Sequence, residues 1–266
     1  MTPQYASAIE DIWHGAADWR MWSRLGWLDI KRRYRRTTVG PFWAAFQILT
    51  MVFTVGFLWA ALFSQPISRY MPHLASGLVV WTLIGAILGE GGTVFTSGQN
   101  LLTTMRIPKT LLVAAMIWRN VIVFFHNLMV FALVALLWQV PVTWNTLLFI
   151  PGLVLLSLNG MWIGLLIGIV ATRLRDIPQF ITGIMQILMF LTPVMWSRDI
   201  LKGHEAVGYI IDFNPFTHLV EIVRTPLLGG APSALNWIAS AALVVVGFAG
   251  TLYVFSRFRQ RIAFWL

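Results

Sequence analysis

Cysteine and charged side chains are scarce in this sequence. There is no cysteine among the 266 residues, which excludes disulfides, cysteine-ligated zinc and iron–sulfur clusters. Charged residues make up 11% of the chain and hydrophobic residues 58%, whereas a soluble globular domain carries about 25% charged residues. The composition therefore excludes an ordinary soluble domain and predicts one multi-pass membrane domain over residues 1–266.

Acidic residues and a nucleotide-binding loop are also lacking. The chain has 10 Asp and Glu against 19 Lys and Arg, a net charge of +9. In a membrane protein this excess predicts contact with membrane lipids through their anionic headgroups, and we expect no nucleic acid partner. The glycine-rich stretch Gly89–Gly92 lacks the Lys-Ser/Thr that ends a P-loop. We therefore expect no cofactor on this chain, and any ATP chemistry on a partner.

Six long apolar runs dominate the sequence. The first, Phe42–Phe63, contains no charged residue and would extend over roughly 33 Å as a helix, enough to cross the hydrocarbon core of a bilayer. The others are Leu74–Thr96, Leu111–Trp138, Thr146–Ala171, Ile177–Trp196 and Leu235–Phe255. They predict an all-α integral membrane protein with six transmembrane helices over residues 42–256, followed by a tail, residues 257–266.

Basic residues predict the orientation of this bundle. The stretch Lys31–Trp43 reads KRRYRRTTVGPFW, and its basic cluster holds the start of the first span in the cytoplasm. Basic residues recur in the second-to-third loop, the fourth-to-fifth loop and the tail, which places both termini in the cytoplasm. Residues 5–36 combine tryptophans with charges and predict an amphipathic helix, with Gly26 as a candidate break, so that residues 1–41 lie in the cytosolic interface.

The segment between the fifth and sixth spans has a helix pattern of its own. Asn214 and Pro215 are typical of an N-cap and a first helical residue, and Pro226 is expected to end the helix. The positions between them divide into an apolar side, Phe216, Leu219, Val220 and Val223, and a polar side, His218, Glu221 and Arg224. We expect a short amphipathic helix on the outer side of the membrane. The acids and histidines here lack metal-ligand spacing, so we expect no metal site.

The first span carries a stripe of aromatic residues. Phe42, Phe46, Phe53 and Phe57 fall within roughly 60° of one another on a helix. Flat aromatic faces would let a sugar ring slide past through many shallow contacts, which suits the lining of a polymer channel. The alternative is that these rings face lipid or pack against other helices.

The fifth span carries a polar face. Gln179, Thr182, Gln186 and Met189 lie within about 80° of one another, together with Pro193. Amides inside a membrane normally face protein or water, so this face is a second candidate for channel lining. Hydrogen bonding between helices is the alternative.

Two opposite charges are predicted to pair within the membrane domain. Glu90 lies near the inner end of the second span and Arg119 near the inner end of the third, at similar depth. An unpaired charge there is costly, so we expect a buried ion pair with a structural role. A single acid–base pair is a poor proton relay, which disfavours proton-driven transport.

Six short motifs in register carry a family resemblance. They are LGWLDIKRRYRRTTVGPFW at the start of the first span, RIPK after the second, TRLRDIPQF between the fourth and fifth, LTPVMW at the end of the fifth, NPFTHLVEIVRTPLLG outside, and RIAFWL at the tail. With them, nearly the whole chain resembles the permease subunit of ABC-2-type polysaccharide exporters. The resemblance implies export of a glycan, such as O-antigen or capsule, on an undecaprenyl-type lipid carrier across a bacterial inner membrane.

The resemblance also implies partners and functional surfaces. It implies a homodimer of permeases with a channel between them, and two ABC nucleotide-binding subunits that carry ATP and Mg²⁺. A periplasmic gate would include Asn214, Phe216, Leu219, Glu221 and Arg224. The surface that couples to the ATPase subunit would include Asn100, Met105, Arg106 and Lys109, with residues 100–106 as a short helix. A plain cytosolic loop is the alternative for this last segment.

The basic cluster before the first span is a candidate substrate entrance. Arg32, Arg33, Arg35 and Arg36 present planar donors that match phosphate oxygens in pairs, so they could receive a lipid diphosphate. Topological anchoring explains the same cluster without any substrate. We expect both roles, divided among these residues.

Two other classes of function remain open from the residues alone. A membrane-embedded enzyme of glycan or lipid metabolism would need clustered carboxylates or a histidine-based nucleophile at one interface, and the acids here are few and scattered. A secondary transporter or channel would need more buried ionisable groups or an internal repeat. The permease of an ATP-driven exporter is the reading that we favour.

Overall fold

The structure is a computed structural model that describes residues 3–35, 37, 40, 42–62, 64–105, 107–198 and 205–266. These residues form helices and connecting segments, with no strand among them. The helices are α1 Pro3–Ala17, α2 Trp19–Tyr34, α3 Phe42–Leu62, α4 Ile67–Gly91, α5 Val94–Ser97, α6 Gln99–Thr104, α7 Lys109–Leu137, the 3₁₀ helix η1 Trp144–Leu148, α8 Phe149–Arg173, α9 Ile177–Leu191, α10 Glu205–Phe213, α11 Pro215–Leu227, α12 Ala234–Phe258 and α13 Ile262–Trp265. The predicted all-helical class is confirmed.

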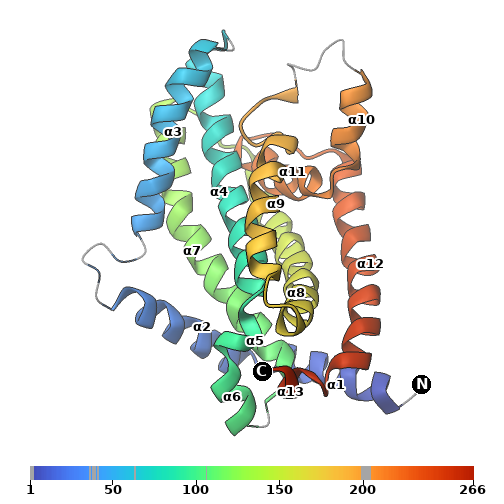
Figure 1. The fold of residues 1–266 in the computed structure, drawn as a ribbon. Helices are drawn as coiled ribbons and strands as arrows, with labels where there is room; N and C mark the ends of the chain where they lie inside the picture. The colour runs from blue at the N-terminus through green and yellow to red at the C-terminus, as the bar shows by residue number, and fades with distance from the viewer. Residues whose placement is uncertain are drawn as a thin grey trace.

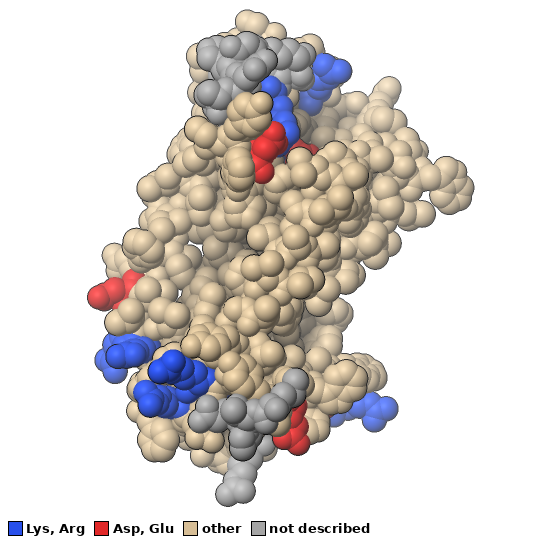
Figure 2. Space-filling model, turned by 90° about the vertical axis from the view of Figure 1, so that its right-hand side faces the viewer, with Lys and Arg blue, Asp and Glu red and all other residues tan. Residues whose placement is uncertain are grey.

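Five helices within the described part are long and apolar enough to cross a membrane: α3, α4, α7, the η1–α8 unit and α12. They run roughly along one direction (Figure 1). We call the end of the bundle that carries α1, α2, α6 and α13 the α2 end, and the end with α10 and α11 the α11 end. On the face seen in Figure 2, charged side chains lie near the top and in the lower half, with a broad uncharged band between them. The chain is therefore a multi-pass membrane protein.

Helix α4 is the centre of the core. It packs against α3, α7, α8, α9 and α11, and most of its length is buried. Close approach to α8 depends on small residues, because a Cβ at Gly91 would lie 3.1 Å from the Cα atom of Gly164. Membrane helices associate through such small-residue contacts, since lipid supplies no hydrophobic drive between them.

The interfacial segment breaks at a different place from the one predicted. Helices α1 and α2 meet at Asp18, and Gly26 lies inside α2. Gly26 is buried, and a Cβ there would lie 2.8 Å from the backbone oxygen of Ala115 on α7. The glycine thus allows α2 to lie close against α7, and the expectation of a break there was wrong.

The second apolar run starts and ends earlier than expected. Helix α4 begins at Ile67, so Pro72 lies inside it, and the helix stops at Gly91 where the short α5 takes over. The Oγ of Ser76 donates to the carbonyl of Pro72 at 2.7 Å within this first part of the helix. The predicted run, Leu74–Thr96, left Pro72 outside the helix, and the structure corrects both of its bounds.

The fifth apolar run is only partly helical. Helix α9 ends at Leu191, and its 15 residues would extend over about 22 Å, short of a bilayer core. The chain continues without helix through Thr192–Trp196. Side chains of α4 and of the N-cap of α11 form hydrogen bonds with this segment. The hydroxyl of Tyr70 donates to the Met195 carbonyl, and Nδ2 of Asn214 donates to Oγ1 of Thr192 at 2.9 Å. The prediction of a helix over 177–196 was therefore wrong for its last five residues.

Helix α11 is buried on both sides. Asn214 caps it as predicted, since its side chain accepts from the backbone N–H of Phe216 at 3.0 Å. The sequence predicted an apolar and a polar side for this helix, but His218 and Arg224 of the polar side are themselves buried among α4, α8 and α12. Internal partners make this burial tolerable, because His218 contacts both the Asn236 side chain and a backbone carbonyl at 2.8 Å. Helix α11 also continues past Pro226 to Leu227.

Candidate functional site

Four charged side chains form a chain of contacts at the α2 end of the bundle. Arg119 on α7 donates to Asp29 on α2 and to Glu90 on α4, each at 2.6 Å. Glu90 in turn accepts from Arg33 on α2 at 2.7 Å. The amide of Asn120 adds a hydrogen bond to Glu90 at 2.8 Å. The structure thus brings Glu90 and Arg119 together, as their similar depth predicts, within a larger network.

This network fastens α2 to the membrane helices. Asp29 and Arg33 are one helical turn apart on α2, so their side chains lie on the same face and reach α7 and α4 respectively. Burial alone would lower the pKa of Arg33, but the hydrogen bond and charge of Glu90 raise it above its ordinary value. The i, i+4 spacing of Asp29 and Arg33 is visible in the sequence. Nothing in the sequence indicates that each of them binds a residue more than 50 positions away.

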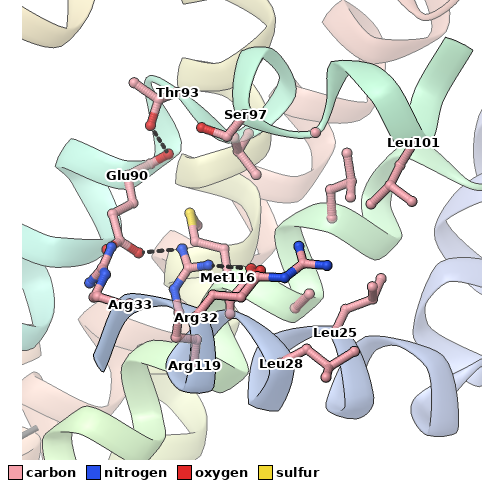
Figure 3. Close-up of a pocket in the computed structure, with 15 residues that line it drawn as sticks. Leu25, Leu28, Arg32, Arg33, Glu90, Thr93, Ser97, Leu101, Met116 and Arg119 are labelled. Atoms are coloured by element: carbon pink, nitrogen blue, oxygen red, sulfur yellow. Dashed lines mark hydrogen bonds and ion pairs between the residues drawn. The ribbon is translucent and has the colours of Figure 1, made fainter. Parts of the chain in front are cut away.

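A cavity of about 310 Å³ adjoins the network. Its wall comes from α2, the end of α4, α5, α6 and α7, and Figure 3 shows these elements around it. Glu90, Arg33 and Arg119 lie on one side, and Leu25, Leu28 and Leu101 on the other. The site thus places charged groups beside an apolar surface.

The four arginines predicted as an entrance occupy different surroundings. Arg33 is bound to Glu90, whereas the exposed Arg32 extends into the cavity (Figure 3). Arg35 is exposed just after α2 ends, and Arg36 lies outside the described residues. The three described arginines therefore do not form one uniform basic patch.

The aromatic stripe lies on the outer side of α3. Phe42, Phe46 and Phe57 are each about half exposed, while the opposite side of the helix is buried. Phe53 packs between Phe57 and Trp138, with ring centroids 6.0 and 6.1 Å away. Within one copy of the chain the stripe therefore faces lipid, water or another subunit.

The polar face of α9 is also uncovered. Gln179, Thr182 and Gln186 are exposed, and α9 has no buried residue. Thr182, Gln186 and Met189 line a groove of about 490 Å³ between α9 and α4, whereas Gln179 lies outside it. Exposed amides in an apolar helix indicate water or another protein on this side.

Comparison with known proteins agrees with this architecture. A family model described as ABC-2 type transporter matches residues 21–228. The chain belongs to this family of ABC-2 type transporters. It is also 22% identical over 237 residues to the O-antigen export system permease protein RfbA of Myxococcus xanthus, which covers 88% of this chain and 91% of the relative. The family predicted from the sequence motifs is confirmed, and the chain is an ABC transporter permease.

The segment expected to couple this ABC-2 permease to its ATPase lies at the α2 end. Residues 99–104 form the short helix α6, with Asn100 exposed and Met105 half exposed after it. Lys109 starts α7, while Arg106 lies outside the described residues. A cavity of about 570 Å³ lies between this segment, α1 and the end of α12.

A carboxylate that sequence reasoning missed holds this segment of the permease in place. Asp11 on α1 is buried and accepts from the backbone N–H groups of Lys109 and Thr110, at 3.3 and 3.2 Å. Arg259 Nε donates to the same carboxylate at 2.9 Å. Asp11 thereby satisfies free N–H groups at the start of α7 and joins both ends of the chain. The sequence pattern of residues 5–36 gave no sign of this role for Asp11.

The predicted gate residues of the permease lie along α11 and at its N-cap, and they contact different neighbours. Glu221 binds its neighbour Arg224, and the Thr225 hydroxyl donates to Glu221 at 2.6 Å. Arg224 also donates to the carbonyl of Pro193 in the segment that follows α9. Phe216 packs edge-on against Trp81 on α4, and Leu219 is fully buried. Helix α11 is therefore tied both to α4 and to the end of α9.

Proposed function

We propose that this ABC-2 chain is the permease subunit of an ATP-driven exporter that moves a lipid-linked polysaccharide out of the cytoplasm, through the inner membrane of a bacterium. The observation that carries this proposal is the likeness to an O-antigen export permease over 88% of the chain. The family match supports the transport role, and the relative's name supports the glycan. The carrier would be an undecaprenyl-type lipid.

The energy source in this proposal is a pair of ABC nucleotide-binding subunits that bind ATP and Mg²⁺. The sequence has no P-loop, so hydrolysis needs a partner. Docking is proposed at α6 and the residues around it, Asn100, Met105, Arg106 and Lys109. The exposure of Asn100 and Met105 supports this assignment, as does the anchoring of the same segment by Asp11.

The polymer path in this proposal lies between two copies of the chain. The stripe on α3 and the polar face of α9 both lie on the outer surface of one copy, so neither can line a channel enclosed within it. A homodimer could bring them together around water. The amides of Gln179 and Gln186 would then be hydrated or paired instead of facing lipid.

The two ends of this path are proposed from the charged clusters. Arg32, Arg33, Arg35 and Arg36 would form the cytosolic entrance for the lipid diphosphate, and Arg33 would serve mainly to anchor α2 because Glu90 already binds it. Asn214, Phe216, Leu219, Glu221 and Arg224 would form the outer gate, supported by their contacts with the segment after α9.

Reconstitution tests the transport function. The purified permease would be placed in proteoliposomes with a lipid-linked glycan, with and without a co-expressed ABC ATPase subunit. Export should require both the ATPase and ATP hydrolysis. Export by the permease alone, or failure of any ATPase to co-purify with it, would contradict the proposal.

The path can be tested in the same assay. Each phenylalanine supplies one shallow contact, so Phe46→Ala or Phe53→Ala alone should slow export mildly and the double variant more. Phe248→Ala on α12, a half-buried ring on a helix that carries neither surface, serves as the control. A second measurement is the labelling of Cys introduced at position 46 or 53 by a water-soluble thiol reagent. If neither position is labelled and the double Ala variant exports normally, the stripe contacts lipid or protein instead.

A further inference from the structure

The cavity at the α2 end has one positive charge that nothing in the described protein neutralises. Three guanidinium groups and two carboxylates line it. Asp29 and Glu90 are engaged by Arg119 and Arg33 through the contacts of 2.6 to 2.7 Å described above. Arg32 makes no ion pair or hydrogen bond with any residue that the structure describes. One cation in this cavity therefore lacks a counter-ion among the described residues.

The network explains why Arg32 stays unpaired. Its nearest carboxylate along α2 is Asp29, three residues earlier and on the same helix face. Arg119 binds that carboxylate at 2.6 Å, and Glu90 is occupied by Arg33 and Arg119. Figure 3 shows Arg32 extending away from Glu90 across the cavity. The packing of α2 against α4 and α7 thus directs the Arg32 guanidinium into the cavity.

The rest of the wall suits the apolar part of an amphiphile. Leu25, Leu28, Leu101, Leu112 and Met116 all line the cavity. Trp19 and Trp27 on the same helix are exposed by 59% and 49%, which is typical of a helix at the level of the lipid headgroups. A volume of about 310 Å³ lies at the small end of ligand cavities, enough for a headgroup and the first carbons of a chain.

We propose that this cavity binds the phosphate group of a lipid through Arg32. The planar guanidinium would pair two of its N–H groups with two phosphate oxygens. The adjoining carbons of the lipid would contact Leu25 and Leu28. Two sources share this chemistry, a phospholipid of the bilayer and a prenyl-linked phosphate. The inference deepens the entrance proposed above and rests on that proposed function only for the prenyl source.

Binding to the purified full-length permease in neutral detergent tests the proposal. The probes are dioctanoyl phosphatidic acid, dioctanoylglycerol, farnesyl diphosphate and inorganic phosphate, with affinity measured by a spectroscopic titration. Dioctanoyl phosphatidic acid or farnesyl diphosphate should bind the wild type, and Arg32→Gln should weaken that binding at least tenfold. Lys31→Gln should bind like the wild type, because Lys31 stacks on Trp27 and does not line the cavity. Arg32→Lys, which keeps the charge without the paired donors, should fall between the two.

The control probes decide the outcome. Equal binding of dioctanoylglycerol, equal binding of inorganic phosphate, or equal loss in Lys31→Gln and Arg32→Gln would each overturn the proposal. Tighter binding of farnesyl diphosphate assigns the site to a prenyl carrier, and tighter binding of phosphatidic acid assigns it to the bilayer. This binding assay contains no ATPase and no glycan, so a negative result here would not contradict the proposed export function. Failure of export in the reconstitution assay would likewise not contradict this binding site.

Discussion

At the scale of residues, Glu90 is a charged group that joins three helices, α2, α4 and α7. Its carboxylate binds Arg33 at 2.7 Å and Arg119 at 2.6 Å, and it also accepts from Asn120. Removing it leaves two guanidinium groups short of a partner. Arg119 would keep Asp29, however, so the loss should be smaller than for an isolated buried pair.

We therefore predict that Glu90→Gln lowers the free energy of unfolding of the detergent-solubilised protein by about 2 kcal/mol. The double variant with Arg119→Gln should recover part of the loss, with a coupling energy of about 1 kcal/mol in a double-mutant cycle. Asp29→Asn should cost less than Glu90→Gln, because Asp29 is 41% exposed and binds a single arginine. Strictly additive losses for positions 90 and 119 would show that the two side chains do not interact.

The surroundings of Glu221 at the α11 end make the stability of the folded protein depend on pH. Burial alone would raise the pKa of Glu221, but Arg224 and the hydrogen bond from Thr225 lower it below its ordinary value of 4.5. A carboxyl whose pKa is lower in the folded state contributes stability that is complete above pH 4.5 and is lost as the pH falls through the folded-state pKa. The melting temperature of wild type should therefore drop more steeply below pH 4.5 than that of Glu221→Gln. Parallel pH profiles for the two proteins would contradict this assignment.

At the scale of elements, the fold depends on close helix contacts at glycines. Helix α11 lies against α8 where a Cβ at Gly152 would be 2.2 Å from the backbone oxygen of Ile222. Helix α9, by contrast, has nothing within 4 Å of a Cβ placed at Gly183. Helix α11 is thus closely packed against α8 at Gly152, whereas the side of α9 at Gly183 is open.

This contrast gives a matched pair of variants. Gly152→Ala should lower the free energy of unfolding by about 1–3 kcal/mol, because backbone cannot move aside as a flexible side chain can. Gly183→Ala should be neutral or stabilising by up to about 1 kcal/mol, through helix propensity. Thermal unfolding followed by fluorescence-detected size exclusion would measure both. Equal effects would mean that α8 and α11 do not pack as described.

At the scale of the whole molecule, the path of the chain between α8 and α12 bears on the sixth crossing predicted from the sequence, beside the five helices that are long enough to span a membrane. The end of α8 lies at the α2 end, since Arg173 stacks on Trp265 of α13 at 5.8 Å. The segment after α9 lies against the start of α4 and against α11, near the other end. Helix α9 and Thr192–Trp196 together therefore lead from one end of the bundle toward the other, as a helix followed by turns and bends.

We predict that Arg175 and Ala231, which flank this stretch, lie on opposite sides of the membrane. A membrane-impermeant thiol reagent should label Ala231→Cys in intact cells. It should label Arg175→Cys and Gln260→Cys only after permeabilisation. The absence of native cysteine makes the background clean. Labelling of positions 175 and 231 from the same side would rule out a crossing by α9, and labelling of 260 in intact cells would contradict a cytosolic tail.

Local patterns in the sequence predicted much of this protein. Charge scarcity and apolar runs predicted a helical membrane domain and located its long helices, because period and length are local properties. The cap at Asn214 followed from side-chain chemistry two residues from its partner. The approach of Glu90 to Arg119 followed from similar depth on consecutive spans, since a bilayer makes an unpaired charge costly.

Only the tertiary structure decided which distant surfaces meet. It placed Asp29 and Arg33 on partners far along the chain, left Arg32 alone in a cavity, and buried His218 and Arg224. It also ended α9 at Leu191, where carbonyls of the next residues bond to side chains of α4 and α11. These outcomes depend on how whole helices are positioned relative to one another. Sequence periodicity does not determine those positions, because the same pattern is compatible with a helix face toward lipid, toward water or toward protein.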